Sequence, residues 1–292
     1  MTPVKRVLKI DDWFHADGFP ISIERRDPQE DFGPHSHEFD ELVLVLGGRG
    51  LHRIGSESWE LSAGDVFVVS GPREHEYRDL QELRLVNILY QPAQLRLRLL
   101  DMASVAGYHA LFTLEPRRKP RQNHAGRLRL NPRDLAQAVE WIDRLESELR
   151  QRAPGFGFMA TATFMILVGF LSRCYGGRPA ADDQALLRLG EALSHLERNI
   201  LQEVNLDELA SIAHMSRRSF QRSFQAAMGV SPLTWLINQR IQRASAMLRH
   251  TDKRITEIAF DVGFNDSNYF TRQFRKVTGC PPRTYRTRQG IR

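Results

Sequence analysis

The sequence predicts an α+β fold in two domains: a β-barrel with a helical hairpin, then an all-α domain in which one pair of helices occurs twice. Three observations predict it. Residues 21–90 alternate short apolar runs with glycine and proline turns, which is typical of short strands in a barrel or sandwich. Two stretches of helical periodicity follow, and from residue 186 onward the chain reads as helices with short breaks. Its 292 residues exceed the usual size of one domain, so two cores are expected.

The amino-terminal residues and the cysteines indicate where the protein works. The apolar stretch in MTPVKRVLKIDDWF is interrupted by Lys5, Arg6 and Lys9, so it lacks the pattern of a signal peptide. Two cysteines, Cys174 and Cys280, give no disulfide framework. Both observations predict a cytoplasmic protein.

Strands of the barrel are expected in three apolar runs. These are LVLVLG at 42–47, DVFVVSG at 65–71 and LRLVNILY at 83–90. Glycine, proline and the polar segment GSES separate them, so each run is expected to be one short strand.

A helical hairpin is predicted after the barrel. Asn131 followed by Pro132 is typical of a helix start, and an apolar stripe at helical spacing carries this helix to about Gln151. The stripe consists of Ala138, Trp141, Ile142, Leu145 and Leu149. A second helix, 158–175, is apolar nearly all round, but its most apolar run, 156–171, is too short and too interrupted to span a bilayer, so no membrane partner is expected. The surplus apolar surface either packs within the chain or pairs with a second subunit in a homodimer.

A linker is predicted where GGRPAADD interrupts the helical pattern. We therefore assign residues 1–175 to the first domain, 176–185 to the linker and 186–292 to the second domain. The charge differs between the two sides: from residue 184 onward there are 17 Lys and Arg against 9 Asp and Glu, and before it 24 basic against 26 acidic residues. The basic excess of the second domain predicts a polyanionic partner.

The second domain contains one short helix twice. NYFTRQF at 268–274 repeats SFQRSF at 219–224, with the matching phenylalanines and arginines fifty positions apart. The apolar stripes of the two copies are Phe220, Phe224 and Ala227, and Phe270, Phe274 and Val277. Opposite each apolar stripe lies a polar stripe of Arg with Gln, Asn or Thr, the side chains that address base edges and phosphates.

A shorter helix precedes each copy, LDELASIAHMS from Leu206 and ITEIAFDVGFN from Ile255. Asn205 and Glu208 match a cap pair at the start of the first. A short helix, a turn and a helix with one apolar and one polar face make a helix-turn-helix motif, and this chain has two. Between them, SPLTWLINQRIQRASAMLRH predicts a linking helix that lets the two motifs enter successive major grooves, about 34 Å apart.

At this point the sequence resembles the AraC/XylS family of bacterial transcription regulators over roughly residues 186–286. The most specific segment is ITEIAFDVGFNDSNYFTRQFRKVTGCPPRTYR. The resemblance implies a sequence-specific regulator that binds double-stranded promoter DNA. The base-facing positions that it implies are Arg218, Gln221 and Arg222 in the first motif, and Ser267, Asn268, Thr271 and Arg272 in the second. The first motif has His214 where the second has Gly263, so its turn requires an unusual backbone conformation of a non-glycine residue.

A group of histidines marks the barrel. In GPHSHEFDELVLVLGG, the residues His35, His37 and Glu41 have the spacing of a cupin metal motif, and His75 in GPREHEYRD completes the set. The segment resembles a cupin barrel, although Ser70 stands where the second cupin motif usually has proline. Three imidazoles and a carboxylate suit a transition metal, whereas barrels of family members with this architecture sense a small molecule, often a sugar, through the same positions. Effector contact, a bound metal and purely structural histidines remain open, and a site requires Glu41 to line a cavity beside the histidines.

Two further segments, LVNILY at 85–90 and YHALFTLEP at 108–116, resemble the L-rhamnose-responsive activators of this family. The sequence therefore predicts a dimeric activator that responds to L-rhamnose or another monosaccharide, with RNA polymerase as a further partner and no cofactor assigned. One alternative is a metal-dependent cupin enzyme that uses the histidines and Glu41 and whose helical domain regulates its own gene. Another is a DNA-bending protein that responds to no ligand.

Overall fold

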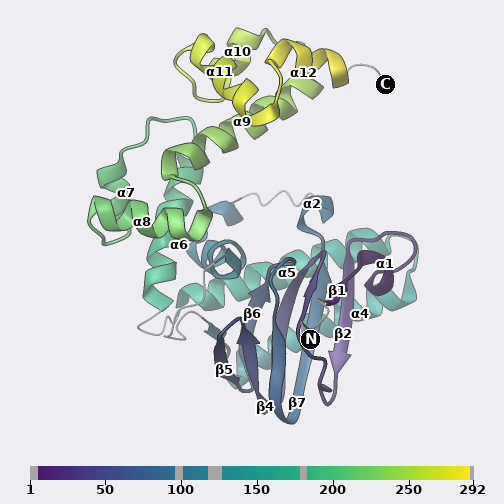
Figure 1. The fold of residues 1–292 in the computed structure, drawn as a ribbon. Helices are drawn as coiled ribbons and strands as arrows, with labels where there is room; N and C mark the ends of the chain where they lie inside the picture. Colours follow the sequence, from purple (N-terminus) through teal and green to yellow (C-terminus); the bar gives the residue numbers. More distant parts are fainter. Residues whose placement is uncertain (1–5, 96–100, 118–126, 178–182, 290–292) are drawn as a thin grey trace, which may run out of the picture. The chain divides into compact units, whose positions relative to one another are not determined.

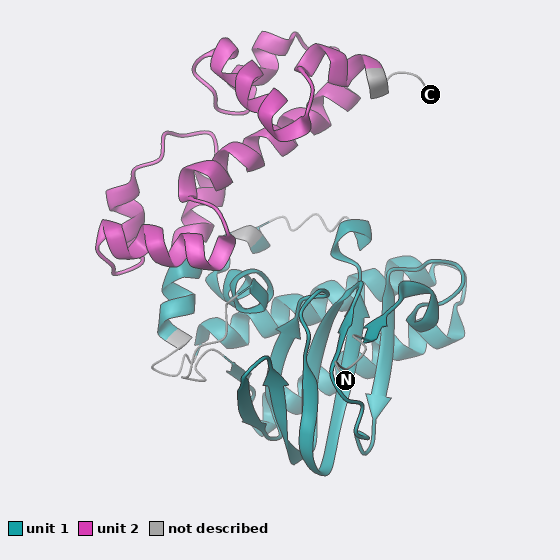
Figure 2. Cartoon of the chain, viewed as in Figure 1, with its two compact units in different colours: residues 1–190 teal, residues 191–292 magenta. Residues whose placement is uncertain are grey.

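The structure is a computed structural model that describes residues 6–95, 101–117, 127–177 and 183–289. The chain forms two compact units, Met1–Gly190 and Glu191–Arg292, coloured separately in Figure 2. The mixed α+β class is confirmed, because the strands lie in the first unit and the described part of the second is helical. The predicted linker lies partly outside the described residues, and the division between the units falls within α6 (Asp183–Arg198).

A six-stranded sheet forms the frame of the first unit (Figure 1). Its strand order is β2-β7-β4-β6-β8, and β5 pairs with β4. The strands are β2 (Ile21–Arg26), β4 (Asp40–Ile54), β5 (Glu57–Leu61), β6 (Asp65–Val69), β7 (Glu76–Tyr90) and β8 (Leu128–Arg129). All pairings within this sheet are antiparallel, and a separate parallel pair joins β1 (Arg6–Leu8) to β3 (His35–His37).

Strands β4 and β7 are longer than the sequence predicts. Each has 15 residues, and their pairing shifts register between Val45 and Leu51. The glycines there were expected to end a strand, but they form bulges that bend it instead. Gly48 has a φ of 72°, and a Cβ at this position would lie 1.9 Å from the carbonyl oxygen of Glu82, so no other residue fits so close to β7.

The predicted helical hairpin is confirmed as α4 (Pro132–Gln151) and α5 (Phe156–Gly177). The side chain of Asn131 accepts a hydrogen bond from the backbone N–H of Asp134, which caps α4. The ring of Phe164 on α5 lies 5.3 Å from that of Tyr90 on β7, so the hairpin packs on the sheet.

Helix α5 corrects one expectation. Because it continues past Leu171 to Gly177, its 22 residues are long and apolar enough to cross a membrane by length and composition. Its buried face packs inside the first unit, as the core helix of a globular domain does, but Phe158, Met159 and Ile166 are exposed.

Shorter helical segments complete the first unit. They are α1 (Ile10–Trp13), α2 (Pro92–Leu95), η1 (Met102–Ser104), α3 (Ala106–Tyr108), η2 (His109–Leu114) and η3 (Glu115–Arg117). The apolar core of the sheet gathers around Val43, Phe67 and Leu85.

The second unit arranges its helices around one long helix, α9. After the end of α6 it comprises α7 (Leu206–Ile212), α8 (Arg217–Met228), α9 (Pro232–His250), α10 (Ile255–Asp261), α11 (Ser267–Thr278) and α12 (Pro282–Gln289). The linking helix is thus confirmed, and its cap Ser231 accepts a hydrogen bond from the backbone N–H of Thr234. Phe224 of α8 and Phe274 of α11 are both fully buried, and both helices contact α9. One core therefore forms on each half of α9.

Candidate functional site

The first helix-turn-helix consists of α7 and α8. Asn205 caps α7 by accepting hydrogen bonds from the N–H groups of Asp207 and Glu208, which confirms its half of the expected cap pair. The side chain of Glu208 contacts His195 instead of the cap, so the other half is wrong. His214 in the turn has a φ of 51°, so the predicted unusual conformation of a non-glycine residue is confirmed. On the inner face, Phe220 and Phe224 are fully buried.

The second motif, α10 and α11, has the same construction. Gly263 occupies its turn with a φ of 92°, and Asp266 caps α11 through the N–H of Tyr269. Phe270 and Phe274 are fully buried, but Val277 is 43% exposed, so its assignment to the apolar stripe is wrong. The described contacts give no reason for this exposure.

The predicted base-facing residues fall into two groups: the arginines and Asn268 lie opposite the buried phenylalanines of α8 and α11, whereas Gln221, Ser267 and Thr271 lie beside them. Four are exposed: Arg218, Arg222, Asn268 and Arg272. Three are half-buried: Gln221, Ser267 and Thr271. The hydroxyl of Thr271 donates a hydrogen bond to the backbone carbonyl of Ser267, which occupies one of its polar contacts. Both helices thus present arginine to solvent, and the contact of each residue with DNA stays a prediction.

Arg240 on α9 is a residue that the sequence analysis missed. Its guanidinium donates hydrogen bonds of 2.7, 2.6 and 2.6 Å to the carbonyls of Ile200, Gln202 and Gly263. It therefore ties the segment before the first motif to the turn of the second. The signal was an arginine at position i+3 from Ile237 on the apolar stripe of the linking helix.

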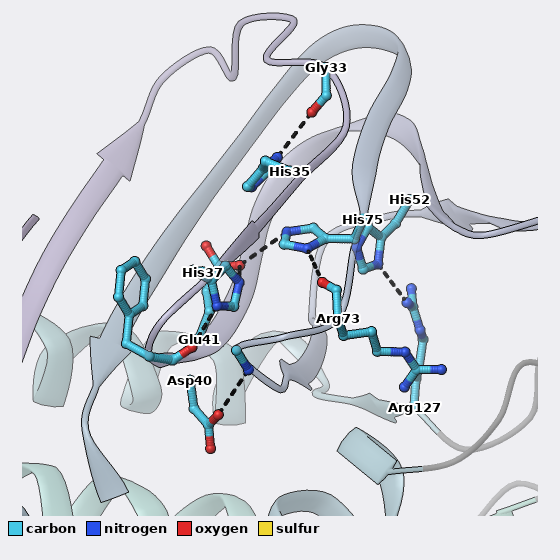
Figure 3. Close-up of polar contacts among 11 residues, drawn as sticks. Gly33, His35, His37, Asp40, Glu41, His52, Arg73, His75 and Arg127 are labelled. Atoms are coloured by element: carbon cyan, nitrogen blue, oxygen red, sulfur yellow. Dashed lines mark hydrogen bonds and ion pairs between the residues drawn. The ribbon is translucent and has the colours of Figure 1, made fainter. Parts of the chain in front are cut away.

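All four predicted residues of the first unit come together: the rings of His35 and His37 lie 4.3 and 5.2 Å from that of His75, and His37 and His75 both contact Glu41. His37 lies on β3, Glu41 at the start of β4, and His75 just before β7. The backbone positions them, because β3 pairs with the segment 71–75: the N–H of His37 donates to the carbonyl of Gly71, and a β-bridge joins His35 to His75. The Nε2 atoms of His37 and His75 lie 3.5 and 3.4 Å from Oε2 of Glu41, as Figure 3 shows for His75.

All four residues are buried, and this burial affects which of them carry a charge. Burial lowers the pKa of His35 to about 4, with nearby His75 adding to the effect. Burial alone would raise the pKa of Glu41, but His37 and His75 outweigh it and hold that pKa below its usual range. The charge of Glu41 is therefore retained inside the unit. Burial alone would lower the pKa of His37, but the contact with Glu41 outweighs it and raises that pKa, so His37 is the counter-charge of Glu41 in a buried ion pair.

A cavity of about 30 Å³ adjoins this cluster, which is room for about two water molecules. His35, His37 and Glu41 line it, and His75 is not among its lining residues. A binding site here was expected to require that Glu41 line a cavity beside the histidines, and the structure meets this requirement. Tyr77 and Asn87 also line it, and their buried side-chain oxygens have no hydrogen-bond partner within the described part of the chain.

Asn87 was not predicted as a site residue, although the sequence carries a signal for it. It is the one amide in the apolar run LRLVNILY, within the 85–90 part of β7 where every residue is buried. A polar side chain at such a position requires a partner.

Two helix-turn-helix motifs with exposed arginines, joined to a β-rich unit whose cavity holds a few buried polar groups in a largely apolar wall, define a DNA-binding transcription regulator with a ligand-binding domain. Comparison with known proteins gives the same class: residues 21–152 match the AraC-like ligand binding domain, whose fold is cupin-like, and residues 209–288 match a helix-turn-helix domain. The chain belongs to the AraC/XylS family of transcription regulators. Its ligands are accordingly promoter DNA and a small-molecule effector.

Curated relatives align over nearly the whole chain. The HTH-type transcriptional activator RhaR of Escherichia coli strain K12 is 31% identical over 96% of this chain and 96% of its own length. That of Yersinia pseudotuberculosis serotype O:3 is 31% identical over 97% of this chain and 94% of its own length. Among solved structures, the DNA-binding domain of AdpA in complex with a target DNA is 33% identical, covers 35% of this chain and 91% of that chain, and has a TM-score of 0.33.

Proposed function

We propose that this chain is a transcription activator controlled by a monosaccharide that binds in the cavity beside Glu41. One observation carries the proposal: Glu41, Tyr77 and Asn87 line the same buried cavity, and the last two have oxygens without hydrogen-bond partners among the described residues. Buried polar groups without partners are rare in folded proteins, and a polyhydroxylated ligand supplies both donors and acceptors. L-rhamnose is the first candidate, because the barrel segments resemble L-rhamnose-responsive activators.

The cavity must enlarge to admit a sugar, since its present volume is about 30 Å³. Leu8 of β1, Trp13 of α1 and Phe32 form part of its wall, all of them outside the six-stranded sheet. Movement of these segments opens the cavity without breaking the pairing of the sheet. A sugar that binds the enlarged state alone shifts the population towards that state.

Control of transcription requires that the sugar favours one way of occupying DNA over another. On the DNA side, we assign base contacts to Arg218, Gln221 and Arg222 of α8. On α11 the assigned residues are Ser267, Asn268, Thr271 and Arg272. Phosphate contacts from the basic second unit make the affinity fall with rising salt concentration.

The remaining partners follow from the same proposal. The exposed apolar side chains Phe158, Met159 and Ile166 of α5 are the proposed contact surface of a homodimer. Activation requires contact with RNA polymerase, in the cytoplasm where both occur. A sensor rather than an enzyme is supported by the curated relatives, which are transcriptional activators.

A thermal-shift screen of the full chain against a panel of monosaccharides tests the proposal. A sugar that binds only the folded protein raises the melting temperature, and the same sugar must change the affinity for a promoter fragment in a gel-shift titration. The variants Asn87→Leu and Tyr77→Phe should weaken the response, because each removes one polar group of the cavity. A chain that binds promoter DNA equally with and without every sugar of the panel contradicts it.

A further inference from the structure

Tyr269 lies in the first turn of α11, three residues before Arg272, to which the proposed function assigns a base contact. The guanidinium carbon of Arg272 lies over the ring of Tyr269, 5.8 Å from its centre. This distance is within the range of a cation–π contact. Both side chains are exposed, so the contact lies on the solvent-facing surface of the helix.

We propose that Tyr269 is a positioning residue for DNA recognition: its ring holds the guanidinium of Arg272 in the orientation in which Arg272 reads a base pair of the operator. The inference rests on the proposed function, because that function assigns the base contact to Arg272. It deepens that function by naming the residue on which the accuracy of this contact depends.

The ring of Tyr269 can hold a partner because its own position is fixed. Its centre lies 6.0 Å from that of Phe264, which is 3% exposed and packs on Phe270 with ring centres 5.2 Å apart. The backbone is fixed as well, since the N–H of Tyr269 donates a 2.5 Å hydrogen bond to the side chain of the cap residue Asp266. The tyrosine therefore connects the exposed guanidinium to the buried core of the second motif.

This support should improve base recognition because an arginine side chain is long and flexible. Ordering such a side chain on binding costs conformational entropy, and a side chain that is ordered beforehand avoids part of that cost. A ring over the face of the guanidinium leaves the N–H groups at its edge free, because they point outward in the plane of the group. Arg272 thus remains able to donate two parallel hydrogen bonds, as in the recognition of guanine.

The first motif supplies a matched comparison. Fifty positions earlier, Arg222 takes the place of Arg272 on α8, and Ser219 takes the place of Tyr269. Serine has no ring, so the contact that supports Arg272 has no counterpart at the matching position of α8. Base discrimination by Arg272 should therefore depend on the residue three positions before it, whereas discrimination by Arg222 should not.

A double-mutant cycle on the full chain tests the inference. The probe is an operator fragment selected from random DNA by the wild-type protein, and affinity is measured by gel-shift titration at one salt concentration. Tyr269→Ala should weaken binding about three- to tenfold. In the Arg272→Ala background the same change should have less than about a twofold effect, because the contact is already lost.

Two further variants serve as controls. Tyr269→Phe keeps the ring and removes the hydroxyl, so it should bind within about twofold of wild type. Ser219→Ala, at the matching position of the first motif, should also bind within about twofold of wild type. Far-UV circular dichroism shows that each variant is folded.

Base discrimination separates positioning from a purely structural role. The base pair that Arg272 reads is the one at which an operator change weakens wild type more than it weakens Arg272→Ala. At this base pair Tyr269→Ala should lower the ratio of affinities for the selected and the changed operator about threefold. At the other base pairs the ratio should stay as in wild type.

Three results overturn the inference while the assigned reading face stands. One is an equal loss of affinity from Tyr269→Ala with and without Arg272, and another is an equal loss from Tyr269→Phe, which would make the hydroxyl a direct DNA contact. The third is an equal loss of discrimination at all base pairs, which would indicate a structural role. If Arg272→Ala itself binds and discriminates like wild type, the reading face assigned to α11 is wrong, and the positioning role is wrong with it.

Discussion

The two helix-turn-helix motifs share one construction but differ in how tightly their turns are packed. His214, in the turn of the first, is exposed and has a φ of 51°. Gly263, in the turn of the second, has a φ of 92°, and a Cβ there would lie 2.9 Å from the Cα of Leu201. The second turn packs closely against the segment that precedes the first motif, and Arg240 donates hydrogen bonds to carbonyls of both. The two turns therefore differ although the sequence repeats. We expect the first turn to tolerate substitution, whereas the second requires glycine and determines how the two motifs are joined.

The largest effect is expected for Arg240→Met. It removes three hydrogen bonds to carbonyls, of which that of Ile200 is buried, and hydrogen bonds from a charged donor contribute about 1.5–3 kcal/mol each. We expect the free energy of unfolding of the second unit to fall by about 4 kcal/mol, measured by urea denaturation followed by far-UV circular dichroism. Gln242→Met, at an exposed position on the same helix, should change it by less than about 0.5 kcal/mol. Equal effects of the two variants would show that Arg240 does not join the motifs.

The turn residues give the next comparison. Gly263→Ala places a Cβ against the backbone of Leu201 at a positive φ, so it should cost about 3 kcal/mol of unfolding free energy. His214→Ala keeps a non-glycine residue at the matching position and should cost less than about 1 kcal/mol. The same denaturation measurement checks both. If Ala is tolerated at both positions, the proposed difference in packing between the turns is wrong.

A smaller effect on stability is expected from Glu197, a titratable carboxyl on α6 in the half of the second unit that carries the first motif. Burial raises the pKa of Glu197 from 4.5 to about 7, against the opposing effect of Arg243. The folded state then binds more protons than the unfolded state between these values, so stability falls as pH rises from about 4.5 through 7. Because Glu197 is only partly buried, we expect Glu197→Gln to raise the unfolding free energy by on the order of 1 kcal/mol at pH 8. Near pH 4.5 the two proteins should have equal stability, and a constant difference across this range would contradict the assignment.

The helices of the second unit could be predicted from the sequence because their determinants are local. Caps such as Asn205 and Ser231, and the periodic phenylalanines, lie within a few residues of the helices that they define. Arg240 escaped prediction because its partners are backbone carbonyls some forty residues before it and twenty-three after it.

In the barrel, the spacing of His35, His37 and Glu41 indicated a site but could not select its members. Only the pairing of β3 with the segment before β7 brings His75 to His35 and Glu41, and only the side-chain directions decide that His37 and His75, rather than His35, contact the carboxylate. The lengths of β4 and β7 were missed for a related reason. A glycine such as Gly48 ends a strand or bends it depending on how closely the next strand approaches, and that distance is set by tertiary packing.

The most direct test of the whole account is operator binding by Arg222→Ala, Arg272→Ala and the double variant. The operator is a fragment selected from random DNA by the wild-type protein, and the control is Arg249→Ala on α9, outside both reading helices. If α8 and α11 both read DNA, each single variant should lose about 1–3 kcal/mol of binding free energy, the losses should add in the double variant, and the control should bind like wild type. Unchanged affinity in both single variants would contradict the assignment of the reading faces on which the account depends.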